Sequence, residues 1–256
     1  MDTLQKLRRF NLIMGFFHFI QGIGMLILAN TVIEKIAEFK PTIVQFFLEF
    51  NPSTQSLEVS QKELFELPFG ILVASFLLIS AIAHLLIYFS KDHYTSELKN
   101  NINSYRWFEY ALSSSIMIVL IATLFGIYDI ASLVLIFIVN ASMNLFGLDM
   151  EQLNSKQNKI NWGPFIWGSI AGLAPWIAIL LYMFGNGNFD QVPWFVWAIV
   201  GTYFVAFNTF PINMILQYKK IGKWKDYLYG ERAYIILSLV AKSILAWLVL
   251  FGAMQP

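Results

Sequence analysis

Seven long apolar runs, separated by short polar stretches, constrain the fold of this 256-residue chain more than any other feature. Each run is close to the roughly 20 apolar residues that an α-helix needs to cross a bilayer. Hydrophobic residues make up 57% of the chain and charged residues only 13%, which is far more apolar than a soluble domain. The sequence therefore predicts an all-α membrane protein, a seven-helix bundle with spans at about 10–30, 67–89, 106–126, 130–148, 162–184, 193–217 and 232–252.

The spacing of the apolar residues favours helices over barrel strands, because it does not alternate with a period of two. A helix also satisfies its own backbone in lipid, one segment at a time. We find no linker, repeat or low-complexity stretch, so residues 1–256 are predicted to form one domain. The first run has no small-residue cleavage site after it and is interpreted as a retained span. With no cysteine, the chain has no disulfide or thiolate site.

Basic residues divide unequally between the two sides of the predicted membrane. Thirteen lie on the side of the N-terminus, three lie on the other side (Lys35, Lys40 and Lys62), and Lys242 lies within a span. Because lysine and arginine favour cytoplasmic loops, we expect a multi-pass protein of the cell membrane with its N-terminus in the cytoplasm and its C-terminus outside.

Two polar stretches have features of their own. The long first loop, about 31–66, carries six glutamates and apolar clusters at 43–48 and 64–65, which suggests either an extracellular cap packed on the helices or an acidic solvated connector. The stretch 218–225 mixes lysines with aromatic residues at the predicted cytoplasmic surface. It is expected to anchor helix ends among anionic headgroups, and docking of a soluble signalling partner is the alternative.

Lys242 lies near the middle of the last span, roughly 15 Å from its start at 1.5 Å per residue. A cationic lysine at that depth costs about 2.5 to 3.5 kcal/mol, so it should be deprotonated, paired or covalently modified. Glu109 is the carboxylate best placed to pair with it. Ser113 lies one helical turn after Glu109 and Ser238 one turn before Lys242, so each hydroxyl shares a face with a charge. The alternatives are a headgroup-level Glu109 paired with Arg106, and a transporter whose Lys242 reaches water.

Two histidines add polar groups to the early spans. His18 and His84 could form a polar pocket with Glu109 and take up a proton, or they could bond neighbouring helices. We expect no metal site from so sparse a set. The chain has no phosphate-binding loop, zinc-protease motif or nucleophile elbow, so no enzyme activity is predicted. A net charge of +1 gives no indication of nucleic-acid binding.

A lysine in the seventh helix and a carboxylate in the third resemble the microbial rhodopsins, and the chain is most similar to the heliorhodopsins. The similarity extends over essentially the whole chain. It is carried by Arg106–Tyr110 with Ser113–Ser115, Val139–Met143, Gly172–Trp176, and Gly230–Tyr234 with Ser238–Ser243.

This resemblance implies all-trans retinal on Lys242 as a protonated Schiff base, with Glu109 as its counterion and Ser113 and Ser238 close by. It further implies a polar cavity at His18 and His84, an extracellular hairpin in the first loop, a homodimer and the inverted orientation already indicated by the basic residues. The implied retinal pocket comprises Met143, Trp176, Phe207 and Trp247, with Asn140 nearby.

Two positions favour a photosensor over a pump. Pumping rhodopsins place a carboxylate four residues before the lysine and a titratable group about eleven residues after the counterion, where this chain has Ser238 and Leu120. We therefore expect photoisomerisation of retinal to 13-cis to switch the bundle without ion transport. The alternatives are a light-driven proton or ion transporter and a retinal-free seven-helix transporter or receptor.

The distribution of basic residues gives a direct test of topology. In intact cells, a membrane-impermeant label should reach a tag at the C-terminus and miss a tag at the N-terminus. Labelling of the N-terminal tag alone would overturn the predicted orientation, and permeabilised cells provide the control for tag accessibility.

Overall fold

The computed structural model describes residues 3–33, 38–157, 159–185, 187 and 194–253. Within these residues, seven helices are long and apolar enough to cross a membrane, as the sequence predicted. They are α1 (Thr3–Ile27), α3 (Phe69–Phe89), α5 (Ser104–Leu124), α6 (Ile130–Asn154), α7 (Gly163–Met183), α8 (Trp194–Tyr218) and α9 (Tyr227–Ala253).

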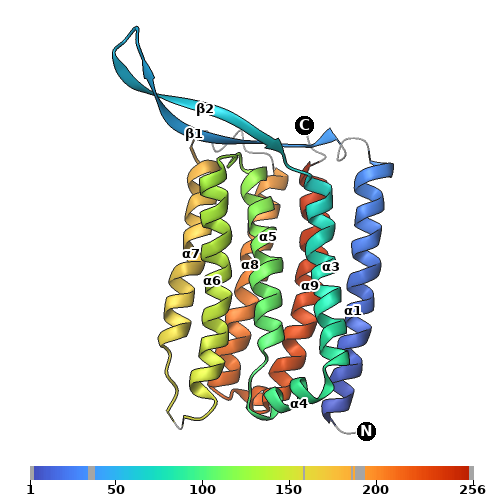
Figure 1. Ribbon diagram of the computed structural model, residues 1–256. Helices are drawn as coiled ribbons and strands as arrows, with labels where there is room; N and C mark the ends of the chain where they lie inside the picture. The colour runs from blue at the N-terminus through green and yellow to red at the C-terminus, as the bar shows by residue number, and fades with distance from the viewer. Residues whose placement is uncertain (1–2, 34–37, 158, 186, 188–193, 254–256) are drawn as a thin grey trace.

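The seven helices stand side by side as a bundle (Figure 1). Helix α1 packs on α3 and α9, α5 lies between α3 and α6, α6 packs on α7, and α8 packs on α9. The short helix α4 (Lys91–Lys99) marks the end at which α1 begins, here called the α4 end. Helix α9 ends at the opposite side of the bundle, which carries the strands and is called the hairpin end (Figure 1).

Several helices extend beyond their predicted spans. Helix α1 begins at Thr3, α6 continues to Asn154 and α9 begins at Tyr227, because hydropathy detects only the apolar middle of a helix. The sequence also did not predict α4, the π-helical turn η1 (Leu28–Val32) or the 3-10 turn η3 (Gly222–Lys225). Position 193, where the sixth span was predicted to begin, lies outside the described residues, as does Lys35.

The first loop forms an antiparallel hairpin of β1 (Thr42–Asn51) and β2 (Ser56–Glu66). The hairpin implied by the family resemblance is therefore present. Its base is attached to the bundle, because Val44 N donates to Tyr128 O at 3.0 Å and Ile43 is fully buried. Farther along, Phe46 and Leu48 are 52% and 62% exposed. The expected packing of the apolar clusters on the helices is thus wrong beyond the base, and the strands extend past the bundle (Figure 1).

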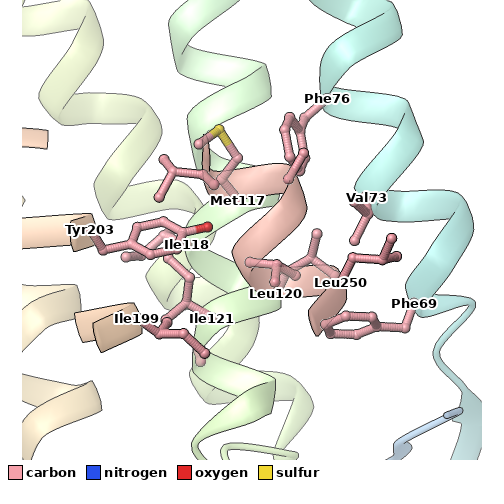
Figure 2. Close-up of a cluster of buried hydrophobic side chains, with 14 of the residues drawn as sticks. Phe69, Val73, Phe76, Met117, Ile118, Leu120, Ile121, Ile199, Tyr203 and Leu250 are labelled. Carbon is pink, nitrogen blue, oxygen red and sulfur yellow. The ribbon is translucent and has the colours of Figure 1, made fainter. Parts of the chain in front are cut away.

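The half of the bundle toward the hairpin end is filled with apolar side chains. Figure 2 shows residues of α3, α5, α8 and α9 meeting there without a charged group among the labelled residues. Leu120 lies in this cluster and is fully buried. The labelled members are Phe69, Val73, Phe76, Met117, Ile118, Leu120, Ile121, Ile199, Tyr203 and Leu250.

The half toward the α4 end depends on a close contact between α5 and α6. The Trp107 ring of α5 lies against Gly147 of α6, where a Cβ atom would overlap the indole. Glycine is needed there for its lack of a side chain. Gly24 of α1 is different, because a Cβ atom there would meet no other atom within 4 Å.

We predict that Gly147→Ala destabilises the protein by about 1 to 3 kcal/mol, the usual cost of overpacking a filled core. Gly24→Ala, the matched control, should leave stability unchanged or raise it, because alanine favours helix over glycine. The measurement is the temperature at which each purified variant loses its monodisperse form. Equal midpoints for the two variants would contradict the predicted contact.

Candidate functional site

Lys242 is 3% exposed and points into the bundle from the middle of α9. Its Nζ forms an ion pair with Glu109 Oε1 of α5, whose side chain is 7% exposed. Because an ionised group is costly to bury alone, each of these charges makes burial of the other tolerable. The structure therefore brings together the two charges singled out in the sequence and places Arg106 elsewhere.

Ser80 of α3 joins this ion pair as a third member. Lys242 Nζ donates to Ser80 Oγ at 2.7 Å, and Ser80 Oγ donates to Glu109 Oε1 at 2.7 Å. Nothing in the sequence indicated that Ser80 would meet Lys242. Its contact with α9 spans 162 residues of sequence, which no helical spacing could reveal.

The two histidines lie together beside the pair. The rings of His18 and His84 stack with their centroids 5.4 Å apart. Asn11 Nδ2 donates to Leu7 O and to Tyr94 Oη, so its Oδ1 is left to accept from His84 Nδ1 at 2.7 Å. This bond places a hydrogen on Nδ1 and leaves Nε2 of a neutral His84 as the basic nitrogen.

A small polar cavity of about 20 Å³ lies next to the ion pair and could hold about one water molecule. Glu109, Ser80, His84 and Ser238 all line it. His18 does not line it, but its ring is fully buried and neither ring nitrogen has a hydrogen-bond partner within the described part of the chain. The structure thus brings His84 and Glu109 to one cavity and stacks His18 on His84.

The other polar residues singled out in the sequence, Ser113, Ser238 and Asn140, are also buried. Ser113 and Ser238 are 0% and 2% exposed. Asn140 of α6 is also buried, and its Nδ2 donates to Ser114 Oγ at 2.8 Å and to Ser115 Oγ at 3.0 Å. Asn140 does not line the small polar cavity or the larger apolar cavity described below. Its hydrogen bonds instead connect α6 to α5.

A second, mostly apolar cavity of about 310 Å³ extends from Lys242 between α5, α6, α7 and α8. Its volume falls within the range of small-molecule sites. Met143, Trp176 and Phe207, expected in such a pocket, are in its wall. Sequence reasoning missed the other aromatic residues of the wall, because the sequence does not show which neighbouring helix an aromatic side chain faces. These residues are Trp107, Tyr110, Phe165, Phe204 and Phe210.

Trp247 is absent from that wall and is 41% exposed. It lies five residues after Lys242, which turns it about 140° around α9 at about 100° per residue. The structure thus places Trp247 on the outer side of the helix rather than in the pocket.

A buried charged network at the α4 end escaped sequence reasoning. Arg106 of α5 forms ion pairs with Glu151 of α6 and Glu231 of α9, and all three side chains are 3% exposed or less. Trp107 Nε1 donates to Glu151 at 2.7 Å, and Asn103 Nδ2 donates to Glu231 at 2.6 Å. The predicted spans ended before Glu151 and began after Glu231, and the longer α6 and α9 place both glutamates inside the bundle.

Comparison with known families agrees with this geometry, because the family model described as heliorhodopsin matches residues 7–254. The chain belongs to the heliorhodopsin family. A search of curated proteins found no match. Membership implies a multi-pass, light-sensing membrane rhodopsin with a retinal chromophore, and not a known class of enzyme.

The residues present fit the chromophore of a heliorhodopsin. Retinal is a long apolar aldehyde, and the larger cavity is lined mainly by aromatic and aliphatic side chains. Lys242 supplies an amine in that wall, and it is the only lysine there among the described residues. The cavity can therefore pack against the apolar chain of retinal along its length, and Lys242 supplies the nitrogen that would bond to the aldehyde carbon.

We predict that Ser80→Ala lowers stability by about 1 to 3 kcal/mol, because a hydrogen bond to a buried charged group is lost. It should also move the absorption maximum of the retinal-loaded protein, since the hydroxyl contacts both charges. Ser75→Ala is the matched control, because that hydroxyl bonds only to Leu72 O of its own helix. Thermal midpoints and absorption spectra of both variants test this, and identical behaviour would refute the bridging role of Ser80.

Proposed function

We propose that this heliorhodopsin is a retinal-binding photosensor whose chromophore, all-trans in the dark, is joined to Lys242 as a protonated Schiff base. The observation that carries the proposal is the position of Lys242, between the apolar cavity on one side and Glu109 on the other. Met143, Trp176 and Phe207 would hold the polyene. When bound, retinal supplies light absorption and an all-trans to 13-cis isomerisation.

Glu109 is proposed as the counterion. Its carboxylate contacts Lys242 Nζ directly and also accepts from Ser80, so negative charge at this atom is stabilised by two donors. The other two buried carboxylates, Glu151 and Glu231, are bound to Arg106 and lie away from Lys242. Neither is placed to share the role of Glu109.

The polar cluster would receive a proton displaced from the Lys242 region. His84 Nε2 is its basic nitrogen, and His84 shares the small cavity with Glu109 and Ser238. Because Asn11 holds the other ring nitrogen, His84 can accept a proton at Nε2 without turning its ring. The proton would then stay within the bundle.

The hairpin half gives no support to a pumping function. A continuous transport path needs polar or titratable groups on both sides of the lysine. Here Leu120 and its buried neighbours form a mainly apolar cluster without an acidic or basic side chain among the residues described (Figure 2). We therefore propose that light changes the charge arrangement around Lys242 and switches the packing of the bundle without moving ions across it.

We further propose that the protein lies in the cell membrane with the α4 end in the cytoplasm and functions as a homodimer. Four exposed lysines lie at the α4 end, two just before η3 and two within it: Lys219, Lys220, Lys223 and Lys225. They would contact anionic lipid headgroups, and a cytoplasmic signalling partner could use the same surface.

The test combines an absorption spectrum with a pH recording. Cells expressing the protein with added retinal should become coloured, and Lys242→Ala should be inserted in the membrane yet colourless. A coloured Lys242→Ala variant that bleaches with hydroxylamine would overturn the proposed attachment site.

The same cells distinguish a sensor from a transporter. Illumination in weakly buffered medium should produce no pH change sensitive to a protonophore. A sustained change that disappears in Lys242→Ala would establish light-driven transport instead.

A further inference from the structure

The charged network at the α4 end has an unequal number of positive and negative groups. Arg106 is the one cation in contact with Glu151 and Glu231, whose side chains are each 1% exposed. Elsewhere in the interior, Lys242 pairs with Glu109. Across the described residues, two buried basic side chains thus face three buried carboxylates, and one negative charge would have no partner if all five were ionised.

An unpaired buried carboxylate is costly, and such a group normally takes up a proton instead. The other titratable side chains around the network are phenols, which are uncharged at neutral pH and cannot balance it. They come from α4, α5, α8 and α9 and include Tyr94, Tyr110, Tyr218, Tyr227 and Tyr234. Arg232 of α9 is at the surface, where its guanidinium lies over the Phe10 ring.

His84 of α3 is the remaining group that could supply positive charge, since it lines the same cavity as Glu231. Its Nδ1–H already donates to Asn11, so a charged ring would need a second acceptor at Nε2. A cationic His84 would be attracted by Glu109 and repelled by Lys242, which already pairs with that carboxylate, and its burial would oppose the charge. The geometry thus favours a carboxylate as the site of the balancing proton.

We infer that Glu151 and Glu231 share one proton around Arg106, forming a buried proton-binding site separate from the Lys242–Glu109 pair. The site belongs to the two carboxylates jointly, because protons on closely coupled groups are held by the pair. It is a property of the chain itself and does not depend on the proposed photosensor function.

The two glutamates differ in their contacts. Glu151 accepts hydrogen bonds from Arg106, Trp107, the Asn103 backbone and Tyr227. Within the described part of the chain, Glu231 accepts only from Arg106 and Asn103 Nδ2, and it lines the small cavity, whereas Glu151 does not. The shared proton therefore exchanges with the cavity through Glu231.

The cavity joins this site to the Lys242 region. Arg106 and Glu231 line one part of it, and Glu109 and Ser80 line another. Arg106 Nε is buried and has no hydrogen-bond partner among the described residues, so a donor is left over for a water molecule in the cavity. Such a water would connect the proton-binding site to the carboxylate beside Lys242.

The experiment uses the full-length protein in lipid, labelled with carboxyl-¹³C glutamate, and solid-state NMR at neutral pH. Carboxylic acids and carboxylates give separate resonances, so the wild type should show one glutamate signal of the protonated kind. The result should be the same with and without retinal, which keeps this test independent of the proposed function. If the wild-type spectrum shows no signal from a protonated glutamate, the inference is wrong. This outcome requires no variant.

Two variants identify the residues that hold the proton. Glu231→Gln and Glu151→Gln should each abolish the protonated signal, because the remaining carboxylate then pairs one-to-one with Arg106 and ionises. Glu63→Gln, an exposed position of β2, is the matched control and should leave the signal intact. A protonated signal that persists in both network variants would place the proton elsewhere and refute the inference.

Discussion

Burial of charge in a medium that cannot solvate it is the constraint on which the rest of this structure depends. Lys242 and Glu109 tolerate the interior because each neutralises the other and Ser80 bonds to both. These contacts draw α3, α5 and α9 together at the middle of the bundle. The same need for pairing explains why Arg106, which packs against the Trp107 and Tyr234 rings, is paired with two glutamates.

The bundle is consequently divided along its length. Buried acidic and basic side chains lie at the level of Lys242 or between it and the α4 end, within the part of the chain described. The hairpin half is filled with mainly apolar side chains, among them residues of α3, α5, α8 and α9 (Figure 2). Because protons travel between polar groups, rearrangement of charge around Lys242 can be transmitted toward the α4 end more readily than toward the hairpin. This asymmetry agrees with the proposed sensor function and with the proposed cytoplasmic position of the α4 end.

Sequence patterns predicted the members of the central pair and missed the residues that surround them. Lys242 and Glu109 were evident because a charge within an apolar run is rare and costly. Ser80, Glu151 and Glu231 were not evident, since serine is common in membrane helices and a glutamate near a span boundary is normally solvated. Trp247 is the opposite case, a residue that was expected in the pocket and is not there. It is close to Lys242 in sequence but points away from the pocket.

The sequence by itself determined the number of spans, their helical character and the two charges at the centre, because hydrophobic length and the cost of an isolated ion are local properties of the chain. Tertiary structure alone decided which polar groups meet. Ser80 reaches Lys242 across 162 residues of sequence, and Arg106 reaches Glu231 across 125. Such contacts depend on how helices are rotated and which ones are neighbours, and that is settled by packing over the whole bundle.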